Sequence, residues 1–128
     1  MSDLIIDTSV LVDVLRDVDA GSDFLLTARR MYRLVVHPVV EAELIAGARN
    51  RSELKLVAKL LDRFESIPLA TIDARTSLRL LRAHRLTHSV SWEDCLLAAT
   101  ALRRETPVAT LNDKHFRAFR ALEVLRPY

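Results

Sequence analysis

Short apolar runs alternate with amphipathic stretches along the whole chain. Apolar runs predict strands at Leu4–Ile6, Leu34–His37, Pro107–Thr110 and Leu122–Leu125, with a brief extended segment at Ser66–Leu69. Helical spacing predicts helices at Val10–Arg16, Asp23–Tyr32, Val39–Ala48, Ser52–Phe64, Thr71–Arg85 and Ser91–Arg104, and a turn or short helix at Asn112–Phe116. Loops are expected at Asp17–Ser22 and Leu86–Val90. This alternation is typical of an α/β fold with a parallel sheet between helices.

Composition limits the class of protein. The chain has 128 residues, of which 50% are hydrophobic and 28% charged, so we expect one globular domain over residues 1–128. No apolar run approaches a membrane span, and we expect a cytoplasmic protein without membrane contact. The single Cys95 excludes an internal disulfide. With only two glycines the chain has no glycine-rich phosphate loop.

Charge alone does not indicate a nucleic-acid partner. The formal net charge is +2 and the isoelectric point is about 9.0, which is only mildly basic. The basic residues are mostly arginine, which suits bidentate contact with phosphate, although a solvated helix face accounts for them equally well.

The first predicted strand ends at a carboxylate. Leu4–Ile6 is wholly apolar, as in a strand buried on both faces, and Asp7, Thr8 and Ser9 follow it. Open α/β sheets bind ligands at the carboxyl ends of their strands, which makes Asp7 a candidate site residue. Asp is also a favoured helix N-cap, so both interpretations stay open.

Other acids lie at comparable positions. Asp94 shares a helix face with small apolar residues, although Ser91-x-x-Asp94 also matches a capping box. Glu41 and Glu43 lie on one predicted helix, and periodicity does not choose between them. The segment from Thr110 to Asp113 again places polar groups after a short strand.

Carboxylates gathered at one edge of a sheet need a counter-charge. Two of them about 4 Å apart repel by roughly 4 kcal/mol at an effective dielectric constant of 20. Protons or a cation would relieve that repulsion. Because the ligands would be all oxygen, without a Cys/His set, they favour Mg²⁺ or Mn²⁺ over zinc. The four histidines show no paired metal-ligand spacing, and Ser9 has no evident base partner.

Segments in four places resemble one known family. They are Ile-Ile-Asp-Thr-Ser-Val-Leu-Val-Asp (residues 5–13), Val-Val-Glu-Ala-Glu-Leu-Ile-Ala-Gly (39–47), Trp-Glu-Asp-Cys-Leu-Leu-Ala-Ala-Thr-Ala-Leu (92–102) and Val-Ala-Thr-Leu-Asn-Asp-Lys-His-Phe (108–116). In this order they resemble the PIN domain, and within it the VapC-type toxin ribonucleases of toxin–antitoxin systems. The resemblance covers essentially the whole chain.

The resemblance implies a three-layer α/β/α sandwich with a mostly parallel central sheet. It also implies a metal-dependent endoribonuclease that uses Mg²⁺ or Mn²⁺, acts on RNA, forms a homodimer and is neutralised by an antitoxin lying across its groove. The family's acidic ligands fall on Asp7, Glu43 and Asp94. Its fourth acid commonly falls where this chain has Asn112, with Asp113 next to it. Asp113 could take that role directly or through water, or Asn112 could supply an amide oxygen. Thr8, Ser9 and Thr110 match polar positions near the family's metal site.

Two other functions remain as alternatives. A PIN fold that binds RNA or protein without turnover fits the irregular fourth position. A receiver-type signalling domain has similar length and architecture, but it would need adjacent acids after the first strand, where this chain has Thr8 and Ser9.

Overall fold

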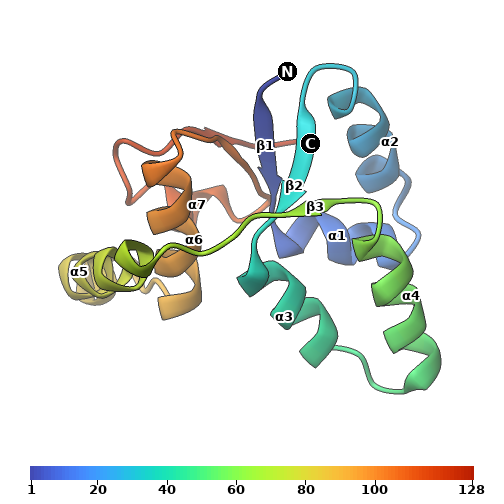
Figure 1. Cartoon of the computed structure of the whole chain (residues 1–128), viewed down its shortest axis with the longest axis horizontal. Helices are drawn as coiled ribbons and strands as arrows, with labels where there is room; N and C mark the ends of the chain where they lie inside the picture. The colour runs from blue at the N-terminus through green and yellow to red at the C-terminus, as the bar shows by residue number, and fades with distance from the viewer.

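The centre of the molecule is a five-stranded sheet in which every pair of neighbours is parallel (Figure 1). A computed structural model describes residues 1–128. The strands are β1 (Asp3–Ile6), β2 (Arg33–Val36), β3 (Glu65–Ser66), β4 (Val108–Ala109) and β5 (Val124–Leu125), in the spatial order β3-β2-β1-β4-β5. The predicted parallel sheet is confirmed.

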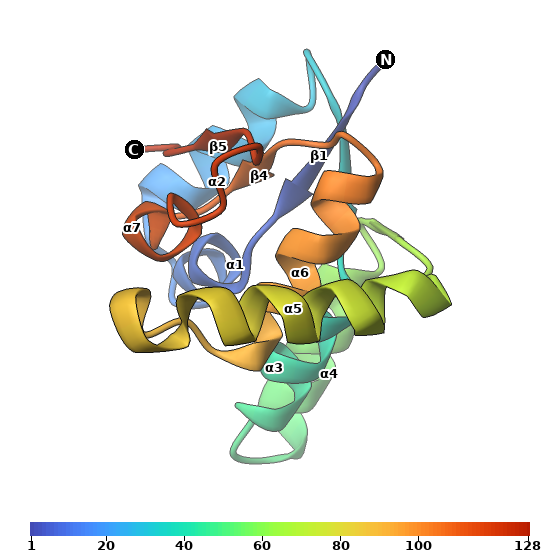
Figure 2. The ribbon, with the colours of Figure 1, turned by 90° about the vertical axis from the view of Figure 1, so that its left-hand side faces the viewer.

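Helices cover both faces of the sheet. The helices are α1 (Thr8–Leu15), α2 (Asp19–Ala28), α3 (Pro38–Ala46), α4 (Arg51–Leu61), α5 (Thr71–His88), α6 (Trp92–Arg103) and α7 (Asp113–Phe116). Figures 1 and 2 show α1 to α4 on one side and α5 to α7 on the other, which gives the three predicted layers. None of the helices is long and apolar enough to cross a membrane.

Strand β1 forms the middle of the core. Leu4, Ile5 and Ile6 are each 0% exposed, because helices lie on both sides of the strand. Ile5 pairs with Val35 of β2 on one side and Val108 of β4 on the other. A strand buried on both faces needs apolar side chains at successive positions, and the opening run supplies them.

Helix α6 is the most deeply buried helix. Every residue from Cys95 to Ala101 is buried. Helix α5 packs along its outer side, as Figure 2 shows, so α6 lies between α5 and the sheet. A helix enclosed in this way has no solvent-facing stripe, which explains its run of small and apolar residues.

The strand order reverses between β1 and β4. The chain builds β1, β2 and β3 toward one edge, then returns to place β4 and β5 on the opposite side of β1. In open α/β sheets such a reversal opens a crevice at the carboxyl ends of the two strands, where ligands bind. Asp7 directly follows β1 and Thr110 directly follows β4, so both residues lie at the carboxyl ends of the two strands where the order reverses.

Some predicted boundaries were wrong. Helix α2 begins at Asp19 within a predicted loop, because Gly21 is a packing residue: a Cβ there would lie 3.2 Å from Val14 Cγ2. Helix α5 runs on to His88 and ends at Ser89, whose φ of 51° lies in the left-handed region. The predicted strands at Pro107–Thr110 and Leu122–Leu125 are each two residues long, in β4 and β5, and the extended segment predicted at Ser66–Leu69 overlaps β3 only at Ser66.

Replacing Ile5 with alanine should test the central role of β1. The substitution leaves a cavity under two helical layers, and we expect a loss of about 3 kcal/mol in the free energy of unfolding. Leu86→Ala is the matched control, because Leu86 is 98% exposed and its loss should cost less than about 0.5 kcal/mol. Urea unfolding followed by circular dichroism measures both. Equal losses would contradict this account of the core.

Candidate functional site

Asp7 lies at the crevice and is almost completely buried, with 6% of its surface exposed. Thr110 Oγ1 donates a hydrogen bond of 2.7 Å to Asp7 Oδ2, and Ser9 Oγ donates one of 3.2 Å to the same oxygen. Asp7 occupies the N-cap position of α1, but its side chain makes no capping hydrogen bond. Its carboxylate is therefore directed toward the crevice residues and not toward the end of the helix.

Ser9 and Thr110 form a small polar bracket around Asp7. Ser9 Oγ accepts a hydrogen bond of 3.0 Å from the Leu111 backbone, and its hydroxyl lies 3.4 Å from that of Thr110. Thr110 Oγ1 accepts a hydrogen bond from the Asn112 backbone. These contacts join the segment after β1 to the segment after β4, so both strands fix the orientation of Asp7.

Glu43 and Glu41 point to different places. Thr8 Oγ1, next to Asp7 in the chain, donates a hydrogen bond of 2.9 Å to Glu43 Oε1. Glu41 instead accepts a hydrogen bond from Ser66 on β3. The structure thus brings Glu43 toward Asp7, while Glu41 lies beside the sheet edge.

Asp94 lies in the first turn of α6 and has two polar neighbours, Ser91 and His115. Asp94 Oδ2 accepts a hydrogen bond of 3.3 Å from the Ser91 backbone, while Ser91 Oγ accepts one from the Asp94 backbone. The capping box is therefore present. His115 Nδ1 lies 3.7 Å from the same carboxylate oxygen. Asp94 is half-buried and close enough to Asp7 and Glu43 for their charges to interact.

Burial and mutual repulsion disfavour the charged forms of these acids. Burial raises the pKa of the Asp7 carboxyl, the Thr110 and Ser9 hydroxyls lower it, and the charge of Asp94 raises it further, with a net rise. Burial likewise raises the pKa of Glu43, against the Thr8 hydrogen bond, and Asp7 and Asp94 add repulsion. The three carboxylates form one region of unbalanced negative charge.

The donor chemistry of Asp7, Glu43 and Asp94 fits a hard divalent cation. All three offer carboxylate oxygen, and a cation among them would offset both desolvation and repulsion. No three acidic, histidine or cysteine side chains in this structure form a ready-made cluster around a single ion position. Binding would therefore draw Glu43 and Asp94, which are less buried, toward the fixed Asp7.

Asp113, the predicted fourth acid, is engaged differently. Arg126 Nη1 lies 2.9 Å from Asp113 Oδ1, and Arg117 Nη2 lies 2.8 Å from Asp113 Oδ2. Arg126, the first of these, is the main reason that the pKa of this buried carboxyl is lowered. Asn112 is exposed and contributes only its backbone to the bracket at Thr110. Sequence reasoning missed the two arginines, although Arg117 lies one helical turn beyond Asp113.

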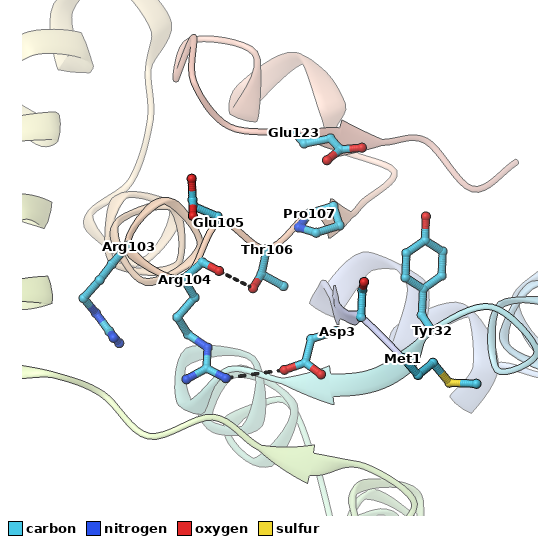
Figure 3. Close-up of a pocket in the computed structure, with 10 residues that line it drawn as sticks. Met1, Asp3, Tyr32, Arg103, Arg104, Glu105, Thr106, Pro107 and Glu123 are labelled. Atoms are coloured by element: carbon cyan, nitrogen blue, oxygen red, sulfur yellow. Dashed lines mark hydrogen bonds and ion pairs between the residues drawn. The ribbon is translucent and has the colours of Figure 1, made fainter.

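Two pockets of similar size lie on different sides of the molecule. One, of about 650 Å³, lies among α1, α3 and α4, and is lined by Glu43 together with Arg16, Arg49 and apolar residues such as Leu56. The other, of about 660 Å³, surrounds Asp3, Arg104 and Pro107 at the amino ends of the central strands β1 and β4 (Figure 3). Only the first pocket adjoins the candidate acids, so we associate it with the site.

Comparison with known proteins agrees with this geometry. The PIN domain family model matches residues 4–122. Ribonuclease VapC10 of Mycobacterium tuberculosis is 36% identical over 121 residues, covering 94% of this chain and 90% of that protein. Ribonuclease VapC19 of the same organism is 35% identical over 124 residues, covering 93% of this chain and 96% of the relative.

Solved structures share the fold. The chain aligns with a chain of the DNA-bound VapBC structure from Salmonella typhimurium with a TM-score of 0.80 and 20% identity, over 100% of both chains. A chain of VapBC2 from Rickettsia felis, bound to a DNA fragment from its promoter, gives 0.79 at 18% identity, over 95% of this chain and 96% of the other. Sequence and structure therefore agree, and the chain belongs to the PIN domain family.

Proposed function

We propose that this protein is a metal-dependent endoribonuclease of the VapC kind, which hydrolyses phosphodiester bonds in RNA and is neutralised by an antitoxin. The observation that carries the proposal is the buried carboxylate of Asp7 at the β1/β4 crevice, in a region of uncompensated negative charge with Glu43 and Asp94. The curated relatives carry the name ribonuclease, which supports the same activity.

Asp7, Glu43 and Asp94 would hold one or two Mg²⁺ or Mn²⁺ ions. When bound, such an ion supplies Lewis-acid chemistry, activating water and offsetting charge on the scissile phosphate and the leaving oxygen. Asp7 is the fixed point of the set, because Ser9 and Thr110 orient its carboxylate. Thr8 orients Glu43, and the capping box orients Asp94.

Asp113 would assist from the first turn of α7. Its carboxylate is now shared by Arg117 and Arg126, whose side chains are 70% and 54% exposed. A substrate phosphate would compete for these guanidinium groups, since arginine binds phosphate with the same bidentate geometry. Moving either arginine to RNA would free one oxygen of Asp113 to act directly or through water.

The pocket beside Glu43 is the proposed place for the antitoxin. Its wall combines apolar side chains of α1 and α4 with Arg16, while Arg49 is paired with Glu53 of the same wall at 2.9 Å. The pocket therefore suits a mainly apolar segment that carries an acidic group for Arg16. The exposed Ile45 on α3 and Leu56 on α4, two of the three helices around this pocket, offer apolar contact area. We also propose a homodimer, for which exposed Ile72 and Leu78 on α5 offer apolar surface.

A PIN fold that binds RNA or protein without cutting is the second candidate. It is favoured by the pairing of Asp113 with two arginines, which leaves the predicted fourth acid engaged in ion pairs. Metal-dependent cleavage separates the two candidates.

Substituting each acid should distinguish ligands from bystanders. Purified protein free of antitoxin is incubated with total RNA and Mn²⁺ or Mg²⁺, with an EDTA control. We expect Asp7→Asn, Glu43→Gln and Asp94→Asn each to lower the cleavage rate by at least about 100-fold, because each removes a charged metal ligand. Asp113→Asn should lower it by about tenfold, since that residue would assist the other three acids and is held by two arginines.

Glu41→Gln is the matched control for Glu43→Gln. It makes the same chemical change on the same helix, but Glu41 faces Ser66 and not the crevice. Its cleavage rate should stay within about twofold of the unchanged protein. Equal loss in both variants would remove Glu43 from the proposed site, and the absence of cleavage with either metal would favour the binding module.

The buried charge of Asp7 should make the metal-free protein less stable as pH rises. The folded pKa lies above the ordinary value of 3.8, so between the two values the folded state binds more protons than the unfolded state. The free energy of unfolding contributed by Asp7 therefore falls as pH rises through that window. At neutral pH Asp7→Asn should raise the melting temperature by roughly 2–6 °C in EDTA.

Asp113→Asn should change the melting temperature in the opposite direction. The folded pKa of Asp113 lies below 3.8, so its ion pairs stabilise the fold above that pH and are lost only as pH falls through the folded pKa. Scanning calorimetry of both variants at neutral pH tests the pair. A lower melting temperature for Asp7→Asn would show that its carboxylate is not an uncompensated charge.

A further inference from the structure

A network of buried polar groups, separate from the candidate site, connects helices α3, α5 and α6. His37, Thr100 and Asp73 are 0%, 0% and 1% exposed, and they come from the start of α3, the middle of α6 and the start of α5. His37 Nε2 lies 2.9 Å from Thr100 Oγ1, and Thr100 Oγ1 lies 2.9 Å from Asp73 Oδ2. Arg103 lies at the end of this network and forms an ion pair of 2.7 Å with Asp73. None of these groups belongs to the proposed metal set.

The surrounding contacts fix the direction of each hydrogen bond. His37 Nδ1 accepts from the Val39 backbone at 3.0 Å, so the ring proton lies on Nε2 and is donated to Thr100. Thr100 accepts that proton, and its own single proton goes to the charged Asp73 carboxylate at 2.9 Å in preference to the Leu96 carbonyl at 3.2 Å. Asp73 also accepts from the Ala70 backbone and twice from Arg103, which accounts for both of its oxygens.

Thr100 joins the two halves of this network, which are His37 and the ion pair of Asp73 with Arg103. On one side it holds the neutral His37 ring, whose pKa burial lowers to about 4, at the N-cap of α3. On the other side it holds the ion pair of Asp73 with Arg103. Helix α3 carries Glu43 and helix α6 carries Asp94, so the hydrogen bond between Thr100 and His37 connects α6 with the N-cap of α3.

We propose that Thr100, through His37 and Asp73, is a positioning residue that sets the spacing of Glu43 and Asp94 for metal binding. The inference rests on the proposed function and adds to it a group that touches neither metal nor substrate. A fully satisfied buried network allows one geometry, whereas apolar contacts of the same volume would allow α3 and α6 to slide. The network brings no net charge toward the acids, so it sets their spacing without neutralising them.

Thr100→Val is the direct test, because it removes the hydroxyl and nearly preserves the volume. Binding of Mn²⁺ to the full chain is measured by isothermal titration calorimetry. We expect the dissociation constant to rise about tenfold, as is typical when support for a metal ligand is lost. Thr100→Ser keeps the hydroxyl and should stay within about twofold of the unchanged protein. In RNA cleavage at saturating Mn²⁺, KM for RNA should stay nearly unchanged while kcat falls.

Thr106→Val is the matched control for general destabilisation. Thr106 is also buried, and its hydroxyl donates to the Arg104 backbone between α6 and β4, near the amino end of β4. It should lower the melting temperature but leave Mn²⁺ affinity unchanged. If Thr100→Val binds Mn²⁺ as tightly as the unchanged protein, or if Thr106→Val weakens binding equally, the positioning role is overturned.

If Thr100→Val fails to fold, a milder change is available at Arg103, at the end of the network, where the side chain is 34% exposed. Arg103→Met should weaken Mn²⁺ binding in the same direction, and Arg103→Lys should largely restore it. Unchanged affinity in Arg103→Met would then count against the proposal.

Amide hydrogen exchange separates failure of this inference from failure of the proposed function. The Val39 amide, which donates to His37, should exchange faster in Thr100→Val and at the normal rate in Thr106→Val, with no metal present. If the unchanged protein binds no Mn²⁺, the proposed function is overturned. An unchanged Val39 exchange rate in Thr100→Val would overturn the connection between α6 and α3 itself.

Discussion

The hydrogen bond from Thr110 to Asp7 joins the two strands on which the site depends. It spans the reversal of strand order, and it holds a carboxylate at the carboxyl ends of β1 and β4, where open α/β sheets bind ligands. Burial makes this arrangement unfavourable for a charged group, so the fold must fix Asp7 through neighbouring hydroxyls and through the pairing of β1 with β4. Glu43 and Asp94 are then arranged around a group that cannot move.

The sequence was sufficient to predict the sheet and the identity of its central strand. An uninterrupted apolar run such as Leu4–Ile6 is typical of a strand covered on both faces, and the alternation of strands with helices predicted the parallel α/β fold. Boundaries were less predictable. Gly21 was interpreted as a loop residue because glycine breaks helices, but here it allows α2 to approach Val14, a contact that local sequence does not encode.

Local pattern could not separate Glu41 from Glu43, since both follow Pro38 on one short helix. The distinction comes from partners far away in the chain: Thr8 binds Glu43 and Ser66 binds Glu41. The same reason explains why the pairing of Arg126 with Asp113 and the buried network through Thr100 were not predicted. Each depends on residues whose proximity follows only from the tertiary fold.

The two outer strands of the sheet have a consequence for how partners can associate with this protein. Strands β3 and β5 each contain two residues, and they form the two edges of the sheet. A visiting strand would find too few free backbone groups to extend the sheet, which also protects against edge-to-edge aggregation. Specific association must therefore use side chains on helical surfaces. Partner choice can then change through a few surface substitutions, while the sheet and the acids at the carboxyl ends of its strands remain the same.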